Sequence, residues 1–333
     1  MNDPRTDRAL GALYGLALGD ALGMPTQIMS RAAITARFGR VTGFEAGPED
    51  NPVAAGMPAG SVTDDTDQAV IVGRLLVESA GRLDPTVLAR ALIEWEQEMR
   101  AKGSSDLLGP STKAALDAVT RGVPVSETGR TGTTNGAAMR VTPVGVAFRH
   151  LPLEHFVDRV VDSCQVTHDT TIGIAGAAAV AAAVSAAVDG AGLVQAMDAA
   201  ESAAAAGARR GHWVAGADIA ARIGWARRLV AGLPVDEAVD VISELIGTSV
   251  ASQESVPAAF AVLTVAGDDP WQACLLAANL GGDCDTIGAI AGAVSGAVAG
   301  LSALPAEAVA TLRSVNGLAL EPLAEALLAL RPA

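Results

Sequence analysis

Glycine recurs at every fourth position along one apolar stretch of the chain, and this spacing restricts how the chain can fold. Glycine occupies positions 288, 292, 296 and 300, in and directly after the helix-like stretch 287–299. Residues four apart lie on one face of an α-helix, so this face carries no side chains. A neighbouring helix can therefore approach nearly to backbone contact and hold the start of this helix rigidly.

The composition also favours closely packed helices. Half of the 333 residues are hydrophobic but only 3% are aromatic, and the apolar content comes largely from alanine, valine and leucine. These residues suit packed helices better than a sheet of β-branched and aromatic strands. We therefore expect an all-α protein. No linker is long or low in complexity, so we expect a single α-helical domain over residues 1–333.

Apolar residues at helical spacing predict where the helices lie. The predicted ranges are 10–22, 69–80, 85–99, 112–119, 137–140, 154–164, 170–188, 193–206, 218–230, 235–246, 256–265, 270–280, 286–300 and 305–330. The segment 172–188 is apolar for long enough to suggest a membrane span. It consists mostly of alanine and glycine and Asp189 closes it, so we expect a buried helix instead.

Charge and cysteine content exclude several classes of partner and site. Acidic residues outnumber basic ones 37 to 23, the formal charge is −14, and Lys and Arg do not cluster. Nucleic acid and membranes are therefore not expected as partners. The three cysteines, Cys164, Cys274 and Cys284, are scattered, so we expect no disulfide framework, no zinc site and a cytoplasmic location. The sequence leaves the oligomeric state open.

Two short acidic clusters share one pattern. Thr63-Asp64-Asp65-Thr66 and Asp283-Cys284-Asp285-Thr286 each open an apolar, helix-like stretch. Taken alone, each cluster is a helix N-cap with acidic neighbours. Together they supply carboxylates and threonine hydroxyls, an oxygen-only set that favours Mg²⁺, Mn²⁺ or Ca²⁺ over zinc or copper. Gly281 and Gly282 precede the second cluster and allow a ligand to approach closely.

Further motifs accompany these clusters in a fixed order. In chain order, the motifs are Gly11-Ala12-Leu13-Tyr14-Gly15-Leu16-Ala17-Leu18-Gly19-Asp20-Ala21-Leu22-Gly23, Thr63-Asp64-Asp65-Thr66, Asn135-Gly136-Ala137-Ala138-Met139-Arg140 with Pro143, Thr167-His168, and Gly281-Gly282-Asp283-Cys284-Asp285-Thr286. Each motif alone is weak, but five in order are specific, and they span most of the chain. The sequence resembles the ADP-ribosylglycohydrolase family, which includes the dinitrogenase reductase-activating glycohydrolase and the ADP-ribosylarginine and ADP-ribosylserine hydrolases.

The resemblance implies an all-α fold with two divalent cations, Mg²⁺ or else Mn²⁺, in a cleft formed by loops and helix N-termini. The metal ligands that it implies are Thr63, Asp64, Asp65, Asp283, Asp285 and Thr286. The substrate-binding residues that it implies are Gln27, Thr134, Asn135, Gly136, His168 and Gly282. The loop before Gly136 would receive a diphosphate through backbone amides, and two ions about 3.5–4 Å apart would grip ribose hydroxyls.

Structural alternatives stay open for several of these residues. The loop at Asn135 and Gly136 is otherwise a plain turn, and His168 is otherwise a capping or buried structural histidine. For Asp20 in the first helix we expect a hydrogen-bonded structural contact. For Arg140 we expect that it packs against the loop and braces it, without touching substrate.

One position departs from the family in a way that affects catalysis. Many members carry a glutamate shortly after the first glycine-rich helix, whereas this chain has Gln27. A glutamine does not accept a proton at neutral pH, so catalysis would fall to Asp65 or Asp106 together with the metals. Asp106 is otherwise an ordinary aspartate of a loop or helix cap.

The expected activity is therefore hydrolysis of a glycosidic bond at C1 of a ribose. The resemblance favours an ADP-ribosyl group of the ADP-ribosyl-arginine type, carried by an ADP-ribosylated protein. A small ribosylated metabolite or nucleoside is an alternative substrate, because Gln27 marks a divergent pocket. A second alternative is a catalytically silent protein that binds ADP-ribose or serves a structural role.

Overall fold

The computed structural model describes residues 3–102 and 108–331, and the regular elements of these segments are helices. Up to residue 168 they are α1 (Pro4–Gly23), η1 (Met24–Thr26), α2 (Arg31–Phe38), α3 (Asp64–Glu78), α4 (Pro85–Ala101), α5 (Pro110–Thr120), α6 (Val125–Thr128), α7 (Gly136–Met139), α8 (Thr142–Ala147) and α9 (Leu153–His168). The later ones are α10 (Thr171–Val188), α11 (Leu193–Gly207), α12 (Ile219–Val230), α13 (Val235–Val241), the π-helical turn η2 (Ile242–Ile246), α14 (Ser252–Ala266), α15 (Pro270–Ala278), α16 (Cys284–Ala299), η3 (Leu301–Ala303), α17 (Ala306–Asn316) and α18 (Glu321–Leu330). Within the described segments there are two isolated β-bridges and no strand, which confirms the all-α prediction.

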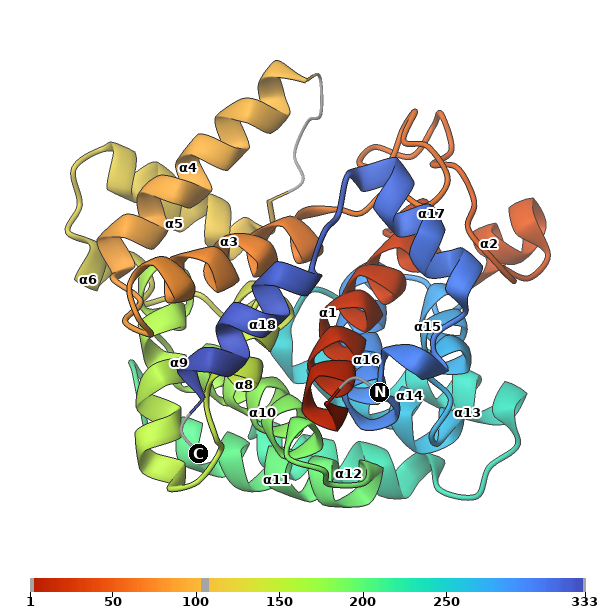
Figure 1. The fold of residues 1–333 in the computed structure, drawn as a ribbon. Coiled ribbons are helices and arrows are strands. Elements are labelled where there is room, and N and C mark those ends of the chain that lie inside the picture. Colours follow the sequence, from red (N-terminus) through yellow and green to blue (C-terminus); the bar gives the residue numbers. More distant parts are fainter. Residues whose placement is uncertain (1–2, 103–107, 332–333) are drawn as a thin grey trace.

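The centre of the fold is a pair of helices from opposite ends of the chain. Helices α1 and α16 lie side by side along their length (Figure 1). A Cβ atom added to Gly11, Gly15 or Gly19 of α1 would lie 1.9–2.1 Å from a backbone oxygen of α16. Only glycine permits this approach, so the predicted contact of backbone with backbone is confirmed, and its partner is α1. We call these three glycines, with Gly288, Gly292 and Gly296 of α16, the glycine interface.

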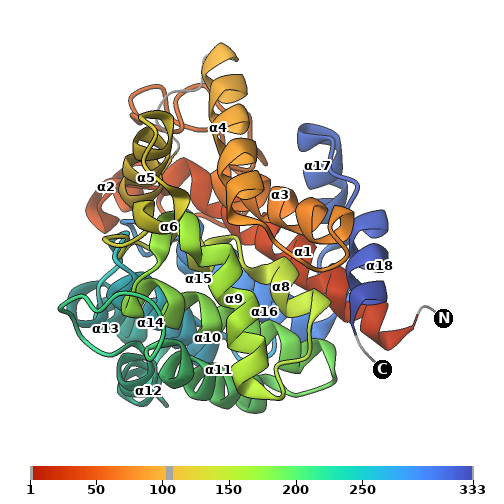
Figure 2. The same cartoon turned by 90° about the vertical axis from the view of Figure 1, so that its left-hand side faces the viewer.

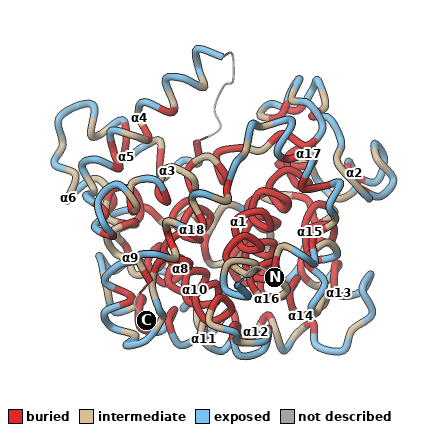
Figure 3. The backbone as a smooth tube through the Cα atoms, in the orientation of Figure 1, coloured by how far each residue is buried: buried red, intermediate tan, exposed pale blue. Residues whose placement is uncertain are grey.

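Helix α10 is the second central element, and it is buried by the helices that surround it. It packs against α7, α8, α9, α11, α14 and α16. It is long and apolar enough to cross a membrane, but 94% of it is buried inside the protein, as predicted for a core helix. The burial map shows α1, α10 and α16 as the buried interior beneath an exposed outer layer (Figure 3).

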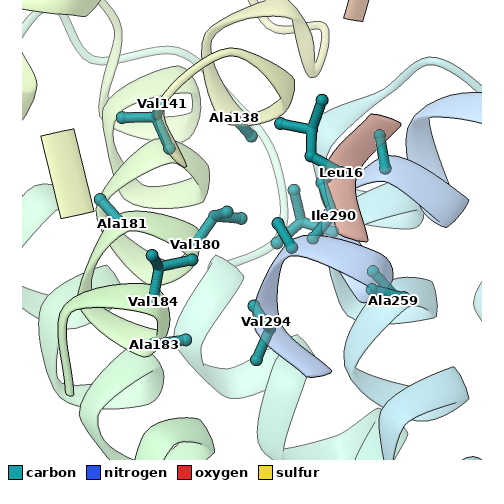
Figure 4. Close-up of a cluster of buried hydrophobic side chains, with 14 of the residues drawn as sticks. Leu16, Ala138, Val141, Val180, Ala181, Ala183, Val184, Ala259, Ile290 and Val294 are labelled. Atoms are coloured by element: carbon teal, nitrogen blue, oxygen red, sulfur yellow. The ribbon is translucent and has the colours of Figure 1, made fainter. Parts of the chain in front are cut away.

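Small and branched side chains fill the space between these central helices. Val180 and Val184 of α10 face Ile290 and Val294 of α16, and Leu16 of α1 completes the cluster (Figure 4). Because the side chains are short, the helices come close together, and this is the packing that an alanine-rich, aromatic-poor composition requires.

Several stretches differ from the sequence-based expectation, among them α6 (Val125–Thr128) and α8 (Thr142–Ala147), where no helix was predicted. The predicted helix 69–80 is α3, which starts five residues earlier because Thr63 caps it and its acidic residues are favourable in a first turn. The predicted helix 305–330 is wrong: Gly317 ends α17 in a left-handed conformation, and α18 starts anew. Helix α2 lies where no helix was predicted.

The start of α3 lies between a protruding part and the central helices. Helix α4 stands away from the body of the molecule, with α5 and α6 nearby (Figure 2). Beneath it, the N-terminal ends of α3, α7 and α16 meet around one cavity. Both acidic clusters therefore reach the same place, although more than 200 residues of sequence separate them.

Candidate metal and substrate site

Asp20, a buried carboxylate of α1, holds the first acidic cluster in place. It accepts hydrogen bonds from the Thr63 hydroxyl at 2.9 Å and from the Thr66 hydroxyl at 2.5 Å. The backbone N–H groups of Thr63 and Thr66 donate to it as well. Asp20 thus caps α3 from outside, which is the structural role predicted for it. Because Asp20 accepts the Thr63 hydroxyl hydrogen and the Asp65 N–H donates to the Thr63 oxygen at 3.4 Å, one lone pair of that oxygen remains available to a cation.

The second acidic cluster is held by a loop on each side. The Asn135 amide donates to Asp283 Oδ2 at 2.5 Å, and the backbone N–H of Asp283 donates to the Thr248 carbonyl at 2.7 Å. Gly282 has a φ of +72°, and a Cβ there would lie 2.3 Å from the Thr248 carbonyl oxygen. Its carbonyl accepts from the backbone N–H of Ile28 at 2.7 Å. Gly282 therefore joins the second cluster to the segment that carries Gln27.

The two clusters face each other across a cavity of about 160 Å³. The Thr286 hydroxyl donates to Asp65 Oδ2 at 3.3 Å, which links one cluster to the other directly. Of the residues predicted for the site, the cavity is lined by Gln27, Asp64, Asp65, Asn135, Gly136, Asp283, Asp285 and Thr286. The remaining lining residues are Ile28, Val53, Leu108, Gly109, Pro110, Met139 and Val250.

Four predicted residues lie behind the cavity wall. Thr63 and Gly282 hold the acidic clusters, as described above. Thr134 and His168 are in contact through the threonine hydroxyl and His168 Nε2, at 2.9 Å. The His168 ring lies directly behind Gly136, 3.0 Å from where a Cβ atom would be. Direct contact of these four residues with a ligand stays a prediction, and Asp106 lies outside the described residues.

Burial and mutual repulsion perturb the carboxylates of the site. Burial, reinforced by the neighbouring carboxylates, raises the pKa of Asp64, Asp65 and Asp285 well above its ordinary value. Burial also raises the pKa of Asp20 and Asp283 to about 6. Five carboxyl groups so close together favour any ligand that brings positive charge.

The donor atoms fit a divalent cation that prefers oxygen. Asp65 Oδ1 and Asp285 Oδ1 are buried and have no hydrogen-bond partner in the described segments. An unpartnered carboxylate oxygen is costly to bury, and coordination of a cation would satisfy it. Over residues 3–102 and 108–331, no three His, Cys, Asp or Glu side chains already converge on one metal position. A cation bound here would therefore also need other oxygen donors such as the threonine hydroxyls, and both the ligand set and occupancy by two ions stay predictions.

The segment after α1 brings an amide and an apolar side chain to the cavity. Gln27 is buried, and its side-chain N–H donates to the Met24 carbonyl at 3.2 Å. Asn51 donates to the Gln27 carbonyl at 3.0 Å and so ties this segment to the long loop before α3. The next residue, Ile28, has a φ of +58° and is 55% exposed. A β-branched residue in this conformation is strained, and such strain is concentrated at functional sites.

Two features of the site were not identified from the sequence. Ile28, Val53 and Val250 give the cavity an apolar wall, and the proximity of Ile28 to Gln27 was the available signal. Gln68 donates to Asp64 Oδ2 at 2.8 Å from one helical turn further along α3. The spacing of four residues between Asp64 and Gln68 would have predicted this contact.

A larger cavity of about 1050 Å³ lies at the opposite end of α16. Leu193, Val194, Met197, Leu263 and Val298 are among its lining residues, and none of the residues predicted for the site reaches it. Its wall is mainly apolar. The smaller cavity is therefore the candidate site, because the acidic clusters and their unpartnered oxygens lie there.

Comparison with known proteins gives one consistent result. The ADP-ribosylglycohydrolase family model matches residues 1–333. The chain is similar to the uncharacterized protein YegU of Escherichia coli strain K12, with 37% identity over 94% of both chains. It is also similar to the ADP-ribosylarginine hydrolase Tri1 of Pseudomonas putida strain GB-1, with 30% identity over 49% of this chain and 42% of Tri1. A solved structure described as an ADP-ribosylglycohydrolase-related protein complex matches 98% of both chains, with a TM-score of 0.69 and 26% identity.

Proposed function

The chain belongs to the ADP-ribosylglycohydrolase family, and from this premise we propose that it is a metal-dependent hydrolase that cleaves the C1 glycosidic bond of an ADP-ribosyl group. The proposed substrate is an ADP-ribosylated protein or peptide of the arginine type. The observation that carries the proposal is the pair of buried, unpartnered carboxylate oxygens, Asp65 Oδ1 and Asp285 Oδ1, on opposite sides of the cavity.

The residues that would hold the cations are Thr63, Asp64, Asp65, Asp283, Asp285 and Thr286. When bound, Mg²⁺ or Mn²⁺ would polarise ribose hydroxyls and make water more acidic. Asp20 fixes Thr63 at the start of α3, and Asn135 fixes Asp283, so both sides of the donor set are oriented before any ligand arrives. Such preorganisation lowers the cost of binding.

The ribose would bind where the two clusters face each other. Cleavage at C1 passes through an oxocarbenium-like transition state, and carboxylates nearby stabilise its positive charge. Asp65 is the proposed general base: a cation would take one of its carboxylate oxygens and the other would face the attacking water, whereas Gln27 cannot take a proton. Asp106 stays the alternative base. Gln27 and Gly136 both line the cavity, so Gln27 would donate its second amide hydrogen to a substrate hydroxyl and Gly136 would offer its backbone.

A small ribosylated metabolite or nucleoside is the second candidate substrate, and the size of the cavity favours it. Sites for drug-sized ligands enclose about 300–1,000 Å³. The cavity of about 160 Å³ encloses a ribose-sized group and leaves the rest of a larger ligand outside.

The test uses protein stripped of metal with a chelator and then supplied with Mg²⁺ or Mn²⁺. The substrates are an ADP-ribosylated arginine peptide, an ADP-ribosylated serine peptide and simple nucleosides. We expect metal-dependent release of ADP-ribose from the arginine peptide. Asp285→Asn should lower kcat/KM by about 100-fold or more and weaken metal binding, since even outer-sphere partners of a metal contribute 10–100-fold.

The matched control is Asp84→Asn at the N-cap of α4, where the carboxylate accepts from the backbone N–H of Thr86 at 2.7 Å. It removes a capping aspartate away from the cavity and should leave the activity unchanged. Release from nucleosides alone would favour the second candidate. Tight metal binding without release from any substrate would refute the enzyme and leave a catalytically silent member of the family.

A further inference from the structure

Arg140, in the segment between α7 and α8, is a buried cation that has no hydrogen bond to an anionic group within the described segments. It is fully buried, and within the described segments the hydrogen-bond acceptors around its guanidinium are neutral. Its Nε has no partner there. Burial lowers the pKa of Arg140 to about 10, which still leaves it charged at neutral pH. The Asp64 charge favours the protonated guanidinium, but the two groups are not hydrogen-bonded to each other, and a buried cation held only by neutral acceptors is costly, so its presence calls for a role beyond packing.

One side of the guanidinium reaches the first acidic cluster. Arg140 Nη1 donates to Gln68 Oε1 at 3.0 Å, and Gln68 Nε2 donates to Asp64 Oδ2 at 2.8 Å. A guanidinium only donates hydrogen bonds, so the Gln68 oxygen must face Arg140 and the Gln68 amide hydrogens must face Asp64. Arg140 therefore sets the orientation of the amide that holds Asp64.

The other side of the guanidinium reaches the loop of Asn135 and Gly136. Arg140 Nη2 donates to the Thr167 hydroxyl oxygen at 2.6 Å, and the same oxygen lies 2.7 Å from His168 Nδ1. Since Thr167 accepts from Arg140, its own hydrogen is free to be donated to Nδ1. With that donation, the proton of the neutral imidazole lies on Nε2, which is 2.9 Å from the Thr134 hydroxyl and can donate to it.

Two chains of hydrogen bonds thus start at the Arg140 guanidinium, which can only donate. One chain ends at Asp64 and the other at the loop of Gly136, and both of these line the cavity. Burial and the Arg140 charge lower the pKa of His168 well below its ordinary value, which keeps the ring neutral as the chain of donors requires. The His168 ring lies directly behind Gly136, so its orientation sets the position of that wall.

We propose that Arg140 is a positioning residue that orients both walls of the cavity, holding Asp64 through Gln68 and fixing His168 as the Nε2–H tautomer through Thr167. The effect on catalysis rests on the proposed function. The hydrogen-bond directions and the tautomer do not, and they are tested separately.

The first test measures the tautomer of His168 by ¹⁵N NMR of the imidazole. We expect Nε2–H in the wild type. Thr167→Val keeps the side-chain shape but removes the donor to Nδ1, so the Nδ1–H form should become populated. Thr120→Val is the matched control, because the Thr120 hydroxyl donates only to the Leu116 carbonyl of its own helix. An Nδ1–H wild type, or an unchanged tautomer in Thr167→Val, would overturn the proposal.

The second test separates the two sides of Arg140. Gln68→Leu should weaken binding of Mn²⁺ alone by about 10-fold, as measured by calorimetry, without changing the His168 tautomer. Thr167→Val should raise KM and leave kcat nearly unchanged, since it moves the loop and not the acidic cluster. Arg140→Lys should weaken Mn²⁺ binding and also change the His168 tautomer, because an ammonium group cannot reproduce the planar, forked arrangement of N–H donors of a guanidinium. If these variants lower only Tm, Arg140 is merely structural. If the wild type binds no Mn²⁺, the proposed function fails, while the tautomer still decides this inference.

Discussion

Gly15→Ala should destabilise the protein although alanine is the better helix former. The added Cβ atom would lie 2.1 Å from the Gly292 carbonyl oxygen, 1.3 Å short of an ordinary contact at 3.4 Å. The obstacle is backbone, so no side chain can rotate away, and the two helices must separate by about that distance. Overpacking of this kind costs up to about 3 kcal/mol. Alanine recovers about 1 kcal/mol of helix propensity, which leaves a net loss of about 2 kcal/mol.

The assay is thermal unfolding of the metal-free protein. A loss of about 2 kcal/mol corresponds to a decrease in Tm of about 3 °C for a chain of this size. Gly43→Ala is the matched control, since a Cβ at Gly43 meets nothing within 4 Å, and its Tm should stay within about 1 °C of the wild type. A Gly15→Ala protein as stable as the wild type would refute the view that backbone contact holds α1 against α16.

Three further predictions concern stability. The pKa of Asp20 and Asp283 is raised to about 6, so between about pH 4 and 6 the folded state binds more protons than the unfolded state. In the presence of a chelator, Tm should therefore fall from pH 5 to pH 7.5, and it should fall less in Asp283→Asn. A rise in Tm over this range would contradict the prediction. Ile28→Asn should raise Tm by about 2 °C, because asparagine tolerates the positive φ and the isoleucine is mostly exposed. Arg331→Met should cost about 3 kcal/mol in chemical denaturation, since Arg331 donates to four backbone carbonyls, whereas the exposed ion pair removed by Arg209→Met should cost less than about 1 kcal/mol.

The sequence predicted most helices because their apolar periodicity is a local property. It was less reliable at ends and breaks, where caps and single residues decide. The start of α3 depends on Thr63 and on Asp20, which lies in another helix, and the break at Gly317 depends on one left-handed residue. Glycine spacing in α16 predicted a close neighbour but could not identify it, although α1 carries the same spacing.

In the candidate site, too, some features could be predicted from the sequence and others could not. The acidic clusters were recognisable because one pattern of aspartate and threonine occurs twice, each time before an apolar helix, and the structure brings both clusters to one cavity. The supporting contacts were not predictable, because Asn135 with Asp283 and Arg140 with Gln68 and Thr167 join residues that are distant in the chain. His168 and Thr134 were identified, but only the structure places them behind the wall.

The glycine interface also dictates when during synthesis the protein can complete its fold. Helix α1 leaves the ribosome before its partner α16, which follows more than 250 residues later. Contacts so distant in sequence slow folding, because the chain must close a long loop before they stabilise anything. Until α16 emerges, the glycine face of α1 has no partner, and Asp20 caps α3 without the second acidic cluster opposite. A nascent chain that ends before residue 284 therefore lacks the cavity, and the site forms only after α16 has been made.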